Sequence, residues 1–370
     1  MSTFITRFET TGPGIRLAVK DLMDMAGVPT TAGCRAVAHV ARPAAADAAC
    51  LAGARAAGAR IVGRANLHEL ALGVTGINPW FGTPVNPLDP TRVPGGSSSG
   101  CAVAVATDEA DVAYGSDTGG SVRIPSACCG TAGLKTTWGR IPLDGVWPLA
   151  PSLDTIGPMA RDVAGLAAGM ALLEPGFVVP DTATDPRRIA RLRLDADPAI
   201  DAAVGAALAA TGWEVVDLHL PEWDEVTAQA GALLVAEAWA SDRAVVERDP
   251  EGIGADVVAR LRLGEPIDTA AIDAARAAQH RWQARLRSLF AEFDAIASPT
   301  LTIFPPTLAE GENLLMARCT LPVNLAGVPA LSIPVPAAGA LPASLQLVGP
   351  WGGEGELLAA GRALEAAAEA

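Results

Sequence analysis

A chain of 370 residues, half of them hydrophobic, is long enough to bury a large core, and its length allows one large α/β domain or two smaller ones. A formal net charge of −14 argues against a nucleic-acid-binding surface, which would need a basic patch. No N-terminal signal pattern and no apolar span of bilayer length is present, so we expect a cytoplasmic protein that binds neither nucleic acid nor membrane.

The spacing of the cysteines and the number of lysines limit the kinds of catalytic site that the chain can form. The six cysteines form no CxxC pair and no metal-type spacing with histidine, which favours reduced, buried thiols and argues against a metal site. Positive charge is carried almost wholly by arginine, because Lys20 and Lys135 are the only lysines. A lysine can lose its proton where arginine cannot, although a plain surface lysine is the commoner case.

The N-terminal half alternates strand and helix patterns. Residues 15–21 predict a short strand with Lys20 at its exit, further strands are predicted at 60–63 and 111–115, and 133–135 is predicted as a strand or a turn. Helices are predicted at 47–58, 66–72, 101–107 and 162–174, with loops over 76–94 and 138–160. This alternation favours an α/β fold.

The middle of the chain reads as mainly helical. Over 176–292, helices are predicted at 199–211, 224–247, 255–263 and 269–292, with one strand at 215–218. Strands at 294–300, 331–335 and 344–349 and a terminal helix from about residue 355 follow. The middle stretch is either a helical lobe on the same sheet or the less constrained half of one domain, and we favour one domain spanning 1–370.

Two glycine-serine clusters, at 94–100 and 116–121, flank an apolar run of small residues. Consecutive glycines before a serine leave backbone N–H groups free to face a developing oxyanion. A flexible linker is the alternative, but linkers are not usually flanked by runs as buried-looking as 102–105. The two clusters therefore predict the backbone loops that form the base of an active site.

Serine is the nucleophile that these clusters offer, and lysine fits best as its base. Residues 96–100 match G-x-S-x-G, but the preceding segment is broken by prolines and is not the strand that this motif requires. None of the four histidines lies in a catalytic motif. A buried, neutral lysine can take a proton from serine, and both Lys20 and Lys135 follow apolar strand-like segments.

Three motifs then carry a family resemblance: AVKD at 18–21, PGGSSSG at 94–100 and GSDTGGSVRIPSACCG at 115–130. Together and in this order they resemble the amidase signature family of Ser–cis-Ser–Lys hydrolases, most closely its small indole-acetamide and aryl-amide hydrolases. The resemblance covers 14–175 and 293–365 and is weak over 176–292. It implies a single large α/β/α domain, with a central mixed β-sheet covered by helices on both faces.

The resemblance also implies roles for individual residues. Lys20 would be the base, Ser97 the bridging serine after a cis Gly96–Ser97 peptide bond, and Ser121 the nucleophile. The oxyanion hole would be formed by backbone N–H groups of Thr118, Gly119, Gly120 and Ser121. Asp117 and Arg123 would order this loop and Ser98 would support the site, with plain structural scaffolding an equal alternative for each.

The activity implied is an amidohydrolase that cleaves a carboxylic acid amide through a serine acyl-enzyme, without cofactor or metal. A pocket for an apolar or aryl amide would be walled by two loops, 70–83 with Trp80 and 143–151 with Trp147. Small urea-like amides remain an alternative substrate class. The alternative is a protein like the A subunit of glutamyl-tRNA amidotransferase, which acts with partner chains. A catalytically inactive scaffold is disfavoured because all three catalytic residues are present. Pairing into a homodimer stays open.

Overall fold

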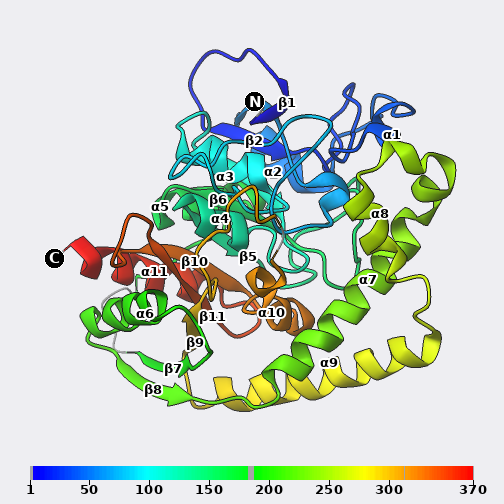
Figure 1. Cartoon of the computed structure of the whole chain (residues 1–370). Coiled ribbons are helices and arrows are strands. Elements are labelled where there is room, and N and C mark those ends of the chain that lie inside the picture. The colour runs from blue at the N-terminus through cyan, green and yellow to red at the C-terminus, as the bar shows by residue number, and fades with distance from the viewer. Residues whose placement is uncertain (1–2, 182–186, 312, 370) are drawn as a thin grey trace.

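One mixed β-sheet organises the molecule (Figure 1). The computed structural model describes residues 3–181, 187–311 and 313–369, and over these residues eleven strands follow the order β1-β3-β2-β4-β6-β5-β10-β11-β9-β7-β8. Their bounds are β1 Phe4–Arg7, β2 Arg16–Lys20, β3 Arg60–Ala65, β4 Val112–Ser116, β5 Ala132–Lys135, β6 Ile156–Ala160, β7 Arg188–Leu192, β8 Glu214–Leu218, β9 Ala295–Pro299, β10 Ala330–Val335 and β11 Ala343–Val348.

Strand directions place two chain segments of the predicted site side by side. β2 runs parallel to both β3 and β4, so the carboxyl ends of β2 and β4 meet at one edge of the sheet. β4 pairs antiparallel with β6, and β5, β10, β11 and β9 continue antiparallel. β7 is parallel to both β9 and β8. The predicted mixed sheet is confirmed.

Helices cover both faces of the sheet (Figure 1). Their bounds are α1 Arg35–Ala38, α2 Ala52–Ala56, α3 Ser99–Ala106, α4 Arg123–Cys129, α5 Val163–Leu173, α6 Pro198–Ala210, α7 Trp223–Arg248, α8 Ala255–Arg262, α9 Thr269–Phe290, α10 Leu321–Ala326 and α11 Glu354–Glu369. Because strand side chains alternate between faces, Leu17 and Val19 pack with α5 in one core, whereas Ala18 packs with α3 in another.

The middle stretch of the chain belongs to the same sheet. It supplies β7 and β8 to the sheet, and α7 and α9 pack against each other and against α10. The division of the chain into one domain spanning 1–370 stays a prediction. No helix within the described parts of the chain has the length and apolar character to cross a membrane. The cytoplasmic location stays a prediction.

The sequence patterns missed or misread several short elements. β6 lies inside a stretch predicted as loop, because Gly157 and Pro158 are typical of loops. The predicted helix over 66–72 is wrong: only a 3₁₀ turn, Glu69–Ala71, forms there, and Leu70 and Ala71 adopt left-handed φ values of 51° and 57°. The predicted helix over 47–58 is divided into a 3₁₀ turn, Ala49–Leu51, and α2. β1, β7, α1, α4 and α10 were not predicted.

Candidate active site

Lys20, the last residue of β2, lies at the centre of the site. Its side chain is fully buried, and its Nζ lies 2.7 Å from Ser97 Oγ and 2.8 Å from Ser116 Oγ. Ser116 is the last residue of β4, so the parallel pairing of β2 and β4 brings the amine and this hydroxyl together. Burial lowers the pKa of Lys20 to about 7, so a large fraction of the amine is neutral near neutral pH.

Ser97 reaches Lys20 from the loop that precedes α3. The Gly96–Ser97 peptide bond is cis, as the resemblance implied. The loop is anchored on both sides of that bond: Gly96 N–H donates to the Val74 carbonyl at 2.7 Å, and the Ser97 carbonyl accepts from His68 N–H at 2.9 Å. Backbone bonds therefore fix the orientation in which the Ser97 hydroxyl meets the amine.

Ser121 lies between β4 and α4, at the floor of a cavity of about 690 Å³. Its exposed fraction is 7 %, and Ser98 N–H donates to its carbonyl at 3.2 Å. Ser98 Oγ donates to the Ser116 carbonyl at 3.2 Å, so Ser98 joins the two glycine-serine clusters. The structure thus gathers both clusters around Lys20, and among the serines of the two clusters Ser121 is the one that lines the cavity.

Asp117 holds the loop before Ser121. Its carboxylate accepts from Gly120 N–H at 3.0 Å and Val122 N–H at 3.1 Å, and it forms a fully buried ion pair with Arg123 at 2.8 Å. Burial alone would raise the pKa of Asp117, but the Arg123 guanidinium outweighs it and holds that pKa well below its usual range. Arg123 also donates to Gln346 and Asn324, at 2.7 and 2.6 Å.

Several polar groups of the predicted oxyanion loop already form hydrogen bonds within the protein. Thr118 Oγ1 donates to Asp154 at 2.6 Å, and the Gly119 carbonyl accepts from Thr320 Oγ1 at 2.6 Å. The Gly120 N–H is engaged by Asp117. Among the residues that the structure describes, the N–H groups of Thr118, Gly119 and Ser121 have no hydrogen-bond acceptor. Gly119 and Ser121 also line the cavity, so their N–H groups are the ones that a substrate oxygen in the cavity can reach.

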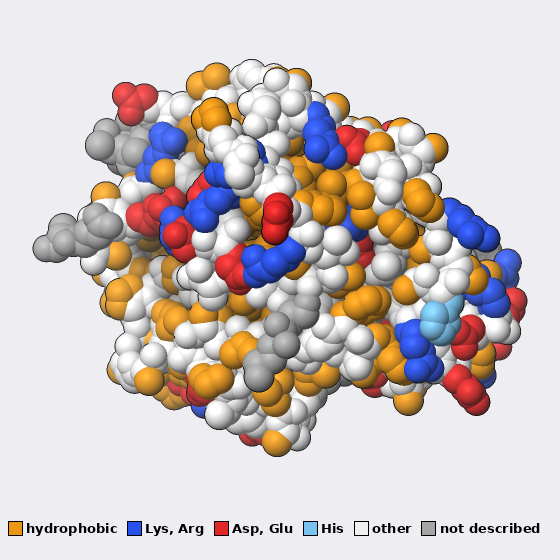
Figure 2. All heavy atoms as spheres, turned by 90° about the horizontal axis from the view of Figure 1, so that it is seen from above, with side chains coloured by type: hydrophobic (Ala, Val, Ile, Leu, Met, Phe, Trp, Pro, Cys, Tyr) orange, Lys and Arg blue, Asp and Glu red, His pale blue; other side chains and the backbone are white. Residues whose placement is uncertain are grey.

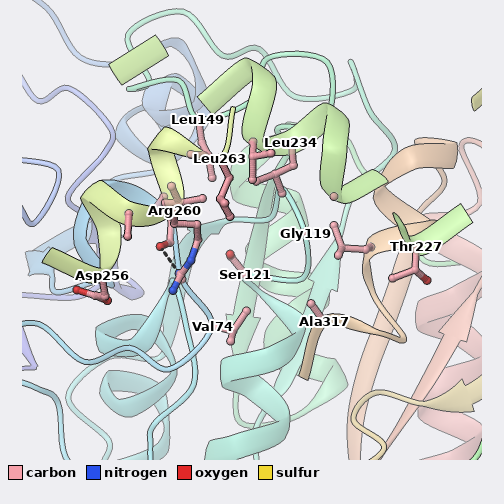
Figure 3. A pocket seen from close by; sticks show the side chains of 17 residues that line it. Val74, Gly119, Ser121, Leu149, Thr227, Leu234, Asp256, Arg260, Leu263 and Ala317 are labelled. Carbon is pink, nitrogen blue, oxygen red and sulfur yellow. Dashed lines mark hydrogen bonds between the residues drawn. The ribbon is translucent and has the colours of Figure 1, made fainter. Parts of the chain in front are cut away.

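The cavity wall is mostly aliphatic and comes from several elements (Figure 3). Loop 71–74 and Leu149 form one part, α7 and α8 form a second, and the segment before α10 forms a third. Arg260 of α8 lines the same cavity as Ser121, and its Nη1 donates to the Leu72 carbonyl at 2.7 Å (Figure 3). Asp256, one turn earlier on α8, is the other charged residue of the lining.

Trp80 and Trp147 do not line this cavity, although loop 70–83 and loop 143–151 both do. Trp80 donates from Nε1 to Glu69 at 2.8 Å and stacks under Arg35, and Trp147 donates from Nε1 to Asp242 at 3.0 Å. Each indole N–H thus donates a hydrogen bond to a buried carboxylate that is not part of the cavity lining. The expectation of an aromatic wall is not met.

The sequence patterns did not predict the part of the wall that α7 forms. Thr227, Gly231 and Leu234 follow one another at helical spacing along α7 and face the cavity together. This signal lay in the sequence, but a helix with apolar or small residues at such spacing is usually only a core-packing helix. Ser116 was also missed, even though it belongs to the second glycine-serine cluster.

Lys135, the second lysine considered as a base, lies elsewhere. Its Nζ donates to the Thr136 and Val328 carbonyls at 2.8 and 2.9 Å, and burial lowers its pKa to about 7 as well. Only Lys20 therefore contacts a serine of the clusters. Within the described residues, no group of three or more His, Cys, Asp or Glu side chains is arranged to hold a metal ion.

Comparison with known proteins places this site in a family. The model of the amidase family matches residues 11–175 and 180–358, so the chain belongs to that family. It is 34 % identical to the A subunit of glutamyl-tRNA(Gln) amidotransferase of Halobacterium salinarum, over 99 % of both chains. It is 35 % identical to 2-amino-5-chloromuconic acid deaminase of Comamonas testosteroni, over 99 % of this chain and 84 % of the relative.

Solved structures agree with this family assignment. A crystal structure of an amidase superposes with a TM-score of 0.88 at 32 % identity, covering 95 % of this chain and 84 % of the other. A protein from a complex linked to the origin of an s-triazine catabolic enzyme superposes with a TM-score of 0.89 at 29 % identity, covering 97 % and 85 %. The chain is therefore an enzyme that acts on amide C–N bonds.

Proposed function

We propose that this enzyme cleaves a carboxylic acid amide through an acyl-enzyme on Ser121, with Lys20 as base and Ser97 as the bridge between them. The observation that carries the proposal is the 2.7 Å contact of Lys20 Nζ with Ser97 Oγ inside a fully buried pocket. A neutral amine in that position accepts the Ser97 proton, while Ser97 Oγ accepts the proton of Ser121.

The proposed reaction has two stages. Ser121 Oγ attacks the amide carbon as its proton passes to Ser97, and the carbonyl oxygen becomes an oxyanion that the N–H groups of Gly119 and Ser121 stabilise. Of the other two residues predicted for this hole, Thr118 supports the loop through its hydroxyl and Gly120 through its N–H. When the C–N bond breaks, the leaving nitrogen takes a proton from Ser97, and water later releases the acid from Ser121. Every step is a proton or acyl transfer, so the proposal assigns no cofactor or metal.

The cavity supports an acyl group with an apolar body. Leu149, Leu234 and Leu321 line it, and aliphatic surface gains free energy by excluding water from such a group. Arg260 adds one cation to the wall of the cavity that Ser121 lines, where its donors can meet an acceptor or an anionic end of the substrate. An amide with an apolar or aryl acyl group that ends in an acceptor fits both features.

Sequence similarity favours a second candidate, a subunit that releases ammonia for partner chains. The relative aligned over 99 % of both chains is the A subunit of an amidotransferase, and its counterparts from Thermus thermophilus and Chloroflexus aurantiacus are 36 % and 35 % identical. The same chemistry at Ser121 would serve that function. On the face seen in Figure 2, basic and acidic side chains are interspersed, so this face offers no basic patch for nucleic acid.

Intact-mass spectrometry after exposure to a fluorophosphonate tests the nucleophile. We expect one adduct on the wild type, none on Ser121→Ala, and a strongly reduced yield on Lys20→Ala. Ser288→Ala removes an exposed hydroxyl on α9 and serves as the matched control that keeps the adduct. An adduct that survives Ser121→Ala would overturn the assignment of Ser121 and point to another serine of the two clusters.

Ammonia release by the purified chain separates the two candidate functions. A free-standing amidohydrolase turns over members of an apolar amide library without any other chain. An amidotransferase-like protein instead releases ammonia from glutamine, and does so efficiently only with a co-purifying partner. Light scattering on the same sample tests whether the chain forms a homodimer.

A further inference from the structure

Helix α8 supplies the charged part of the wall of the cavity that contains Ser121 (Figure 3). Asp256 and Arg260 lie on the helix, and Leu263, which follows it, also lines the cavity. Leu263 is 62 % exposed, so it lies where the cavity opens to solvent. Whatever fixes the start of α8 therefore also fixes these side chains around a substrate.

The start of α8 is capped by a residue from a distant part of the chain. The N-cap residue is Gly254, which has no side chain, and its N–H points away from the helix it begins. Glu69 Oε2 accepts from this N–H at 2.7 Å. A capping-box glutamate does the same from the first turn of its own helix, whereas Glu69 does so from 185 residues earlier in the chain. Its negative charge also lies at the positive end of the helix dipole.

The Glu69 carboxylate is held in one orientation. Its side chain is fully buried, and its other oxygen, Oε1, accepts from Trp80 Nε1 at 2.8 Å. The Trp80 ring is in turn covered by the Arg35 guanidinium, 4.0 Å from the ring centroid. A Cβ atom added to Gly254 would lie 2.9 Å from Glu69 Oε2, so glycine at this position leaves room for the contact.

The segment 68–72 contacts both the predicted catalytic loop and α8. His68 N–H donates to the Ser97 carbonyl at 2.9 Å, and the Leu72 carbonyl accepts from Arg260 Nη1 at 2.7 Å. Glu69 lies between these two contacts and adds the bond to the start of the helix. The backbone that holds Ser97 therefore also holds α8 at two points.

We propose that Glu69 is a positioning residue that caps α8 and so holds this part of the cavity wall against the substrate. Glu69 does not line the cavity, so it acts through α8 and not on the substrate itself. The role rests on the proposed function, because it concerns the cavity in which Ser121 would be acylated. Without the cap, α8 keeps its place in only a fraction of the molecules, and the apparent substrate affinity falls by that fraction.

Fluorophosphonate labelling at several probe concentrations tests the role, because it separates the apparent dissociation constant of the probe from the limiting rate constant. Loss of a hydrogen bond to a buried charged group typically has a roughly tenfold effect or more, so Glu69→Ala should raise the dissociation constant of a long-chain probe about tenfold. The limiting rate constant should stay close to that of the wild type. A short-chain probe, which does not reach α8, should be affected less.

Glu354→Ala is the matched control for a merely structural loss. Glu354 is also fully buried and accepts from a backbone N–H, that of Thr137, at 2.7 Å, and neither residue lines the cavity. Both variants should lower the melting temperature, but only Glu69→Ala should change the affinity for the long-chain probe. Equal long-chain affinities in the two variants, or a fall in the limiting rate constant alone, would overturn the positioning role.

A double substitution tests the same contact with smaller changes. The Glu69→Gln side chain has one carbonyl oxygen, for which Gly254 N–H and Trp80 Nε1–H compete. Trp80→Phe removes the second donor, so the double variant should bind the long-chain probe more tightly than Glu69→Gln alone. A folded double variant without this recovery would contradict the capping role.

Hydrogen exchange measures the cap without any catalysis. The amides of residues 254–258 should exchange faster in Glu69→Ala than in the wild type and should be unchanged in Glu354→Ala. A wild-type enzyme that is not labelled would refute the catalytic proposal, while faster exchange in Glu69→Ala would still support the cap. Unchanged exchange at these amides would refute the capping role alone.

Discussion

Lys20 can act as a base only in the fraction of molecules where its amine is neutral. Burial lowers the pKa of Lys20 to about 7. We therefore expect the rate constant for fluorophosphonate labelling to rise about tenfold per pH unit below that value and to level off above it. Measuring labelling between pH 5.5 and 9 gives the profile.

Two substitutions test whether the midpoint of that pH profile reports the titration of Lys20. Lys20→Arg keeps the charge but cannot lose its proton, so labelling should be lost across the range. Lys135 has a similarly lowered pKa, yet it contacts only carbonyl groups, so Lys135→Met should cost stability and leave the midpoint in place. A midpoint that moves with Lys135 would contradict the assignment of Lys20 as the base.

Ser116 is expected to orient the Lys20 amine. Its hydroxyl lies 2.8 Å from Nζ, almost as close as that of Ser97. Losing one buried hydrogen bond of about 1–1.5 kcal/mol corresponds to roughly a tenfold effect, so Ser116→Ala should slow labelling about tenfold and broaden or shift the pH midpoint. Ser99→Ala is the matched control, because Ser99 Oγ is buried in the neighbouring cluster without a partner. Equal effects of the two variants would argue against an orienting role.

At the scale of elements, the loop that carries Ser121 depends on a buried ion pair. Asp117 and Arg123 are fully buried, and Asp117→Asn would leave the Arg123 guanidinium without its counter-charge. Breaking such a pair typically costs about 3–5 kcal/mol of unfolding free energy. Urea denaturation measures it, with Glu214→Gln as control: its pair with Arg188 is exposed, and such pairs contribute about 0–1 kcal/mol. Similar losses in both variants would contradict the argument.

Elements that depend on local sequence patterns could be predicted, whereas elements that depend on contacts between distant segments could not. Strands β2 and β4 and helices α7 and α9 have regular apolar patterns, and their predicted bounds are close to those observed. The sequence does not predict β6, because its residues, Pro158 among them, are untypical of a strand. They become part of the sheet only through pairing with β4. The cis peptide bond and the gathering of both serine clusters were implied by family resemblance. The cavity wall depends on how α7 and α8 pack over Ser121, which no local pattern encodes.

Gly231 of α7 offers a direct test of that wall. It lines the cavity, and a Cβ added there would have no heavy atom within 4 Å. Gly231→Ala should therefore stabilise the fold by about 0.5–1 kcal/mol, because alanine loses less backbone entropy in a helix. Gly231→Leu should occupy the cavity and slow labelling by long-chain fluorophosphonates more than by short ones.

Gly212 provides the contrast for the stability part of this prediction. Its added Cβ would also meet open space, but its φ of 71° is left-handed. Gly212→Ala should therefore destabilise the protein, as thermal denaturation would show. If both alanine variants changed the melting temperature in the same direction, backbone conformation would not be the deciding factor.

For the whole molecule, the buried ionisable groups predict how stability depends on pH. The pKa values of Lys20 and Lys135 fall from 10.5 to about 7 on burial, so between these values the unfolded chain binds more protons than the folded one. Stability then rises with pH above about 7. Burial raises the pKa of Asp242 to about 7, and the opposing effect of its titration is complete above that value.

Above about pH 9 the buried thiols reverse the trend. Burial raises the pKa of Cys50, Cys101 and Cys319 to about 12, so thiols that ionise in the unfolded chain stay protonated in the folded one. Stability then falls as pH rises further. We expect the melting temperature to climb from pH 7, peak near pH 9 and decline beyond it. Lys135→Met should reduce the climb and leave the decline, whereas a melting temperature that falls steadily from pH 7 would show that the two lysines are not buried as described.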